Sequence, residues 1–139
     1  MNTKRILSGG LLAGLVIFLG DFLINHVALG AYWHELTIRG YLKTVTSFTV
    51  PLMGVQDFGV GFILMWLYAL ARPRLGPGPK TAMIMGSLAW FLFVVPRALE
   101  QAIWYPVPHQ IPLVVLFGGL AQCWIATYIA GWQYIEKAP

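Results

Sequence analysis

The chain alternates four long apolar segments with short polar stretches. The apolar segments cover about residues 6–29, 50–71, 81–103 and 111–134. Each is close to or longer than the ~20 residues with which a helix crosses ~30 Å of hydrocarbon. Within a bilayer every backbone N–H must find its acceptor inside the protein, which favours helices. The pattern predicts an all-α integral membrane bundle of four transmembrane helices in one domain, residues 1–139.

Proline and glycine mark the expected helix ends. Pro51 and Pro112 lie where the second and fourth segments begin, and the first turn of a helix tolerates proline. The stretch 72–80, RPRLGPGPK, should end the second helix near residue 71. In the first loop, 34–48, apolar residues recur at spacings of three and four. That spacing predicts an amphipathic surface helix, lying over the polar groups beneath it.

Composition agrees with a membrane protein. Hydrophobic residues make up 58% of the chain and charged residues 10%, against about 25% charged in soluble domains. So apolar and aromatic a chain is not intrinsically disordered. The net charge of +4 does not indicate nucleic acid, because the basic residues flank the apolar segments and form no continuous stripe. The expected partner is therefore the lipid bilayer.

The distribution of lysine and arginine predicts the orientation. Six of these cations lie before the first segment, between the second and third, or after the fourth, whereas only Arg39 and Lys43 lie in the other loops. The positive-inside rule then places both termini in the cytoplasm, with Trp33 and Trp104 at the outer interface. The basic N-terminus also fits a signal peptide. An aspartate at position 21 would be unusual near a cleavage site, so we expect an uncleaved first span.

Four ionisable residues interrupt the apolar segments. At ~1.5 Å per residue they fall at nearly one depth, in the half of the membrane away from the basic loops. An ionisable group in hydrocarbon costs about 2.5–3.5 kcal/mol on insertion scales, so such groups usually have a partner or a function. Pro96 should kink the third helix beside them. The predicted polar layer comprises Asp21, Asn25, Gln56, Asp57, Arg97, Glu100 and Gln101; His26, Trp33, Trp104 and Gln122 are candidates for an adjoining pocket or interface.

Three interpretations of this layer remain open. In the first, Arg97 pairs with an acid and fixes helix packing in a small structural or accessory subunit. In the second, the excess of three acids over one base serves a proton- or cation-linked transporter or channel component, with Asp21, Asp57 and Glu100 as its acids. In the third, the layer belongs to a lipid- or quinone-binding protein or membrane enzyme. A four-helix monomer is narrow for a pore, so the second interpretation requires a homo-oligomer or larger complex.

Motifs for catalysis and cofactors are missing from the sequence. His26, His34 and His109 lack metal-ligand spacing, and no haem-attachment motif occurs, so we expect neither metal nor cofactor. Neither a nucleophile elbow nor a phosphate-binding loop occurs, which argues against an enzyme. Cys123 is the single cysteine and is expected to be a small buried hydrophobe.

Two weaker patterns concern packing. Gly10 and Gly14 form a Gly-x-x-x-Gly motif, which allows close helix approach within the bundle or in a homodimer. Residues 50–52 (VPL) and 111–113 (IPL) begin two segments alike, as in a parallel repeat of two hairpins. The alternative is that helix starts simply favour proline.

Several short stretches resemble a group of small bacterial membrane proteins with four spans and unknown function. They are residues 21–26 (DFLINH), 29–32 (LGAY), 76–80 (GPGPK) and 111–113 (IPL). The resemblance extends along most of the chain. It implies a multi-pass protein of the bacterial inner membrane and supplies no catalytic or binding residue.

Overall fold

The computed structural model describes residues 2–134, and within this range every regular element is helical. Two of the elements are π-helical turns. In chain order the elements are α1 (Thr3–Phe22), the π-turn η1 (Leu23–Ala28), α2 (Gly30–Ile38), α3 (Thr49–Leu75), α4 (Pro79–Ala89), the π-turn η2 (Trp90–Val94), α5 (Val95–Trp104) and α6 (Gln110–Trp132).

Four continuous helical stretches are long and apolar enough to cross a membrane. They are Thr3–Ala28, Thr49–Leu75, Pro79–Trp104 and Gln110–Trp132. These stretches confirm the all-helical prediction and match the four expected segments to within a few residues. Pro51 and Pro112 lie in the first turns of α3 and α6, where the missing N–H costs no intrahelical hydrogen bond.

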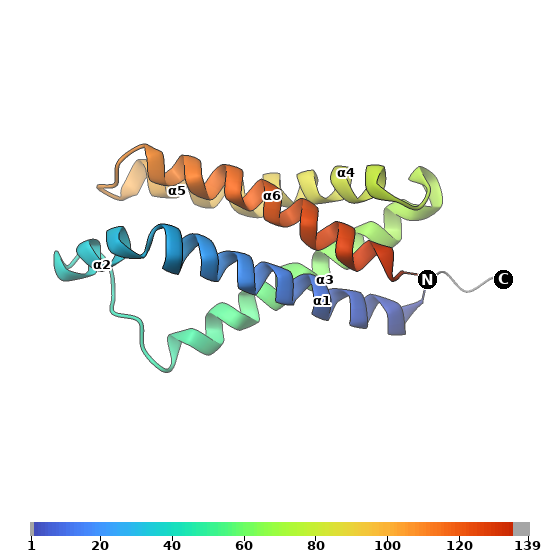
Figure 1. Cartoon of the computed structure of the whole chain (residues 1–139), viewed down its shortest axis with the longest axis horizontal. Helices are drawn as coiled ribbons and strands as arrows, with labels where there is room; N and C mark the ends of the chain where they lie inside the picture. The colour runs from blue at the N-terminus through green and yellow to red at the C-terminus, as the bar shows by residue number, and fades with distance from the viewer. Residues whose placement is uncertain (1, 135–139) are drawn as a thin grey trace.

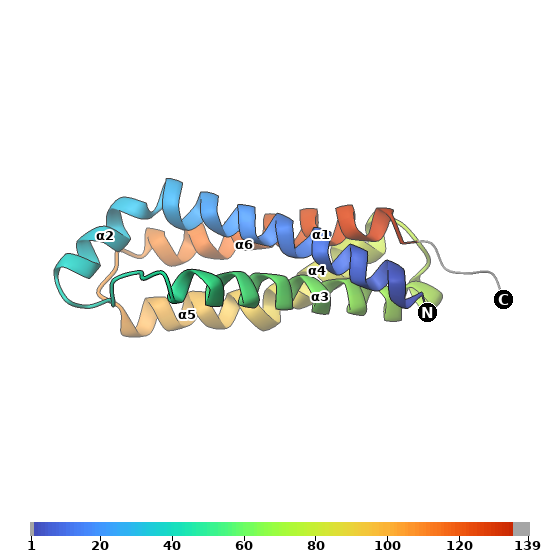
Figure 2. The ribbon, with the colours of Figure 1, turned by 90° about the horizontal axis from the view of Figure 1, so that it is seen from below.

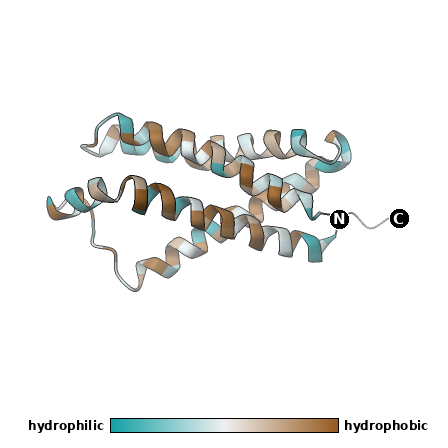
Figure 3. Ribbon diagram, in the orientation of Figure 1, coloured by the Kyte–Doolittle hydropathy of each residue, from teal (hydrophilic) through white to brown (hydrophobic). Residues whose placement is uncertain are grey.

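The four stretches run up and down as an elongated bundle (Figures 1 and 2). Helix α1 packs against both α3 and α6, and α4 packs against α6. We call the end of the bundle that holds the α3–α4 link the terminal end. At this end the backbone N–H of Asn2 donates a hydrogen bond to the Tyr134 hydroxyl at 3.3 Å. The other, the α2 end, holds α2 and the α5–α6 link. Most hydrophobic residues lie along the helices between these ends (Figure 3).

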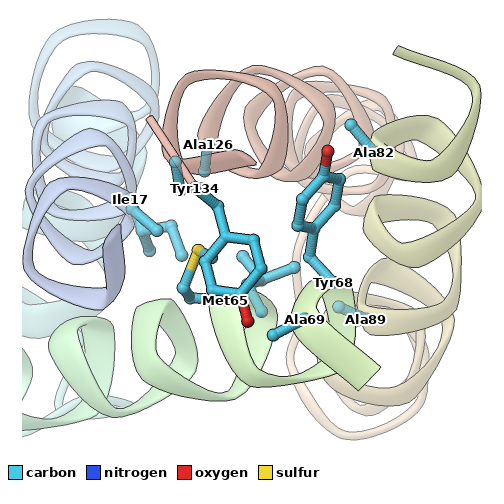
Figure 4. Packing of buried hydrophobic residues seen from close by; sticks show 11 residues of the cluster. Ile17, Met65, Tyr68, Ala69, Ala82, Ala89, Ala126 and Tyr134 are labelled. Atoms are coloured by element: carbon cyan, nitrogen blue, oxygen red, sulfur yellow. The ribbon is translucent and has the colours of Figure 1, made fainter. Parts of the chain in front are cut away.

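Small side chains fill much of the interior, whereas many large apolar ones point outward. Leu15, Val55 and Phe117 are 45%, 71% and 63% exposed. Lipid is as apolar as these side chains, so helices in a membrane associate through small residues and close van der Waals contact. In the half of the bundle towards the terminal end, the terminal half, Leu64 and Met65 are fully buried in the core. Tyr68 packs in the same cluster, and its ring contacts that of Tyr134 edge-to-face (Figure 4).

Helices α1 and α3 cross at glycines. A Cβ atom on Gly61 of α3 would lie 2.5 Å from the Cα of Gly14 and 2.7 Å from the carbonyl oxygen of Gly10. Both obstacles are backbone atoms, which cannot move aside as a flexible side chain can. The Gly10–Gly14 motif thus serves helix packing within the chain.

Two expectations about helix ends were wrong. Helix α3 continues past residue 71 to Leu75 and contains Pro73. A proline so close to the end removes only one hydrogen bond, and the turn is made instead by Gly76 and Gly78, which have positive φ. The predicted helix over 34–48 is also incorrect, because α2 ends at Ile38 and Gly40, with φ +80°, reverses the chain.

Helices α3 and α5 do not pack closely against each other. No Cα atom of α3 approaches one of α5 within 8 Å, although both helices contact other elements. At the α2 end of Figure 1, α5 lies along one side of the bundle and the start of α3 along the other. The charged layer lies at this part of the molecule.

Candidate functional site

A cavity of about 60 Å³ lies between the helices and is lined from both α3 and α5. Space of this size accommodates a few water molecules, which need ~10–15 Å³ each on this measure. Its apolar walls include Ile17, Val60 and Phe93, and all four membrane-length stretches contribute residues. The polar lining consists of Asp21, Asn25, Gln56, Asp57, Arg97 and Gln122.

Asp21 is the centre of a hydrogen-bonded network. Its Oδ2 lies 3.3 Å from Nη1 of Arg97, and its Oδ1 accepts a hydrogen bond from Nε2 of Gln122 at 3.2 Å. The same Gln122 nitrogen donates to the Ile17 carbonyl oxygen at 2.6 Å, and Nδ2 of Asn25 donates to the Asp21 carbonyl oxygen at 3.0 Å. The network joins α1 to α5 and α6. It gives the Asp21 carboxylate both a counter-charge and a neutral donor.

Asp57 is in a different situation. Its residue is 5% exposed and lines the cavity from α3. Within residues 2–134 the Asp57 carboxylate has no hydrogen bond, and no cation lies within 4.0 Å of it. Since Asp21 already pairs with Arg97, the cavity holds two acids and one base. Asp57 is therefore the acid of the cavity that has neither a hydrogen bond nor an ion pair among the described residues.

The structure separates Glu100 and Gln101 from the cavity. Ala98 and Gln101 are the buried residues of α5. Glu100 lies about 100° around the helix from Gln101 and is exposed. The expected excess of three acids over one base is therefore two over one at the cavity. Gln101 is buried, and its Oε1 has no partner in the described part of the chain. Residues 97, 100, 101 and 104 of α5 thus face more than one environment.

Both π-turns adjoin the polar layer. Pro96, expected to kink the helix, lies in the first turn of α5 directly after η2, where the Val95 N–H donates to the Trp90 carbonyl oxygen. A π-turn contains one extra residue, so it rotates all following side chains by about 100° around the axis. This rotation sets the direction of Arg97 towards Asp21. The turn η1 begins two residues after Asp21 and contains Asn25.

The remaining predicted residues lie apart from the cavity. His26 and Trp104 are exposed. Trp33 is half-buried in an apolar cluster at the α2 end, with its Nε1 unpaired among the described residues. A second cavity, about 230 Å³, lies between α2 and the α5–α6 link, lined by Tyr32, Glu35 and Arg39 among others. Within residues 2–134 no three His, Cys, Asp or Glu side chains gather in a metal-binding arrangement.

Sequence reasoning missed the apolar part of the lining. Val60, Phe93, Val94 and Gly119 form walls of the cavity, and Cys123 lines it as a buried side chain. None of these residues is polar, so no charge or motif in the sequence distinguishes them from residues that face lipid. Only their place in the packed bundle identifies them.

Searches for related proteins find no similarity to this chain. No model of a known protein family matches it, and neither does any curated protein or solved structure.

Proposed function

We propose that the chain is a multi-pass membrane protein that binds a proton or a small cation at Asp57, as a component of a transporter. The buried Asp57 carboxylate, which has no ion pair within residues 2–134, carries this proposal. An intramembrane acid of this kind is costly unless it is protonated or binds a cation, and such acids are found in ion and proton pathways. The Asp21–Arg97 pair acts as a neutral neighbour that leaves the charge of Asp57 available.

The closed terminal half favours a binding site over a continuous pore. Leu64 and Met65 are fully buried on the side of the cavity towards the terminal end. A pore would need polar lining through this half, but the core there is made mostly of alanine and other apolar side chains. A site reached from one side at a time is the arrangement that alternating-access transport uses.

The experiment is a flux assay with matched variants. Full-length protein is reconstituted into liposomes, and internal pH or cation content is followed after a gradient is imposed. We expect Asp57→Asn to abolish the protein-dependent flux and Glu100→Gln to retain it, because Glu100 undergoes the same chemical change outside the cavity. Circular dichroism and gel filtration establish that both variants fold. A folded Asp57→Asn variant with full flux, or a wild type with none, would refute the proposal.

A structural or accessory role is the second candidate, and the Asp21 network favours it. This network joins three of the four membrane-length stretches through Arg97 and Gln122. Such a set of bonds specifies one packing arrangement whether or not the protein transports anything. In this case no flux is observed for wild type, and the charged residues matter only for stability.

Location, orientation and assembly belong to the same proposal. We infer that the terminal end faces the cytoplasm, because the lysines and arginines flanking the spans gather there, and that the membrane is a bacterial inner membrane. The bacterial location rests on short stretches such as residues 21–26, and no model of a known family matches the chain. Transport by so small a bundle requires a homo-oligomer or a larger complex. A parallel repeat of two hairpins is supported by the π-turn in the first long helix of each hairpin.

A further inference from the structure

The cavity opens at the surface between α3 and α5, because residues that line it from both helices are exposed: Gln56 on α3 is exposed, and the Arg97 side chain on α5 is 39% exposed. The two helices do not approach each other within 8 Å between Cα atoms, yet Gln56, Asp57 and Val60 of α3 line the same cavity as Arg97 of α5. Phe93, at the rim of the cavity, is 37% exposed. A ligand can therefore reach Asp57 sideways, from the hydrocarbon, without crossing the closed terminal half.

The oxygen atoms available in the cavity do not suit a divalent metal ion. Ca²⁺ takes six to eight oxygen ligands, and Mg²⁺ keeps most of its water. Asp21 is occupied by Arg97 and Gln122, which leaves the Asp57 carboxylate and the side-chain amides of Gln56 and Asn25. One carboxylate and two amide oxygens match the three N–H donors of a primary ammonium group.

The volume of the cavity and the charge of its lining restrict the class of ligand further. Drug-sized ligands occupy pockets of roughly 300–1,000 Å³, so a cavity of about 60 Å³ receives only a head group. The rest of the molecule must then lie in the opening between α3 and α5, which demands an apolar tail. When Asp57 is ionised, the two acids and one base of the lining carry one net negative charge, so a monocation fits better than a zwitterion.

We propose that the ligand of the cavity is an amphipathic primary ammonium compound, with its head at Asp57 and its alkyl tail between α3 and α5. This inference rests on the proposed cation site and adds the class of ligand and the direction of access. The apolar walls at Val60 and Phe93 would contact the first methylene groups of the tail.

Calorimetric titration of the full chain in phosphatidylcholine nanodiscs tests this inference. Phosphatidylcholine carries no primary ammonium, and empty nanodiscs supply the background for partitioning. The probes are ethylamine, n-hexylamine and n-decylamine, with n-decanol as the uncharged control. We expect saturable binding of the longer amines, tightening by up to about fourfold per CH₂ from the ~0.8 kcal/mol that a buried methylene contributes. Decanol should show no saturable binding. Asp57→Asn should weaken decylamine binding at least tenfold, and Glu100→Gln should leave it unchanged.

The outcomes separate this inference from the proposed function. If ethylamine and decylamine bind with equal affinity, and both depend on Asp57, the cation site stands and the lateral position of the tail is wrong. If decanol binds as tightly as decylamine, the charge of Asp57 has no role in recognition and the ligand class is wrong. If no amine binds while the flux assay shows Asp57-dependent transport, this inference fails alone. If the wild-type protein shows neither amine binding nor flux, this inference and the proposed function are both refuted.

Discussion

The ion pair between Arg97 and Asp21 yields the sharpest stability prediction. Replacing Arg97 by Gln removes the single cation of the cavity and leaves two carboxylates facing each other across it. At the 3.3 Å separation, and an effective dielectric constant of 20, the attraction is about 5 kcal/mol. The two side chains are 39% and 27% exposed, so screening and desolvation reduce the net coupling, to about 2 kcal/mol. We therefore expect Arg97→Gln to destabilise the fold by about 2–3 kcal/mol.

A double-mutant cycle assigns that loss to a particular partner. Asp21→Asn in the Arg97→Gln background should recover part of the loss, giving a coupling of about 2 kcal/mol. Asp57→Asn in the same background should show a smaller coupling, because no cation of the described residues lies within 4.0 Å of Asp57. The assay is reversible unfolding in mixed micelles by titration with dodecyl sulfate, followed by circular dichroism. Equal coupling for the two aspartates, or a larger one for Asp57, would refute the pairing described here.

Two further predictions use the same unfolding assay. Gly61→Ala should destabilise the bundle by about 1–3 kcal/mol, since the new methyl group meets the backbone of Gly14, whereas Gly59→Ala, with nothing within 4 Å, should be nearly neutral. An equal loss at both positions would show that contact at the helix crossing does not decide the cost, because alanine has the higher helix propensity. Trp90→Phe should cost about 1 kcal/mol through loss of the 2.8 Å hydrogen bond from its Nε1 to an α6 carbonyl. Trp66→Phe, at a half-exposed position, is its control and should change stability by less than half as much.

The number and length of the membrane helices could be predicted from the sequence because both depend on local properties. A run of ~20 apolar residues is long enough to span hydrocarbon wherever it occurs, and backbone hydrogen bonding then requires a helix. Helix ends were less predictable. Pro73 is tolerated in the last turn of α3, and the chain turns at Gly76 and Gly78 because positive φ is available there.

The depth of the charged layer along the helices could be predicted from the sequence, but which charged side chains pair with each other could not. Rise per residue fixes how far Asp21, Asp57 and Arg97 lie along their helices, and all three line one cavity. Rotation about the helix axis depends on packing and on local helix type. The π-turn before Arg97 shifts the side chains that follow it by about one residue, and α5 packs through Ala98, so Glu100 faces outward.

The sequence by itself determined the four helices, their length and apolar character sufficient to span a membrane, and the presence of ionisable groups within them, because these follow from residue type and distance along the chain. The tertiary structure decided which acid has a counter-charge. Asp21 meets Arg97 and Gln122, whereas Asp57 opens on a cavity beside the space between α3 and α5. That difference depends on the relative rotation and spacing of the helices, and packing among residues distant in the sequence sets both.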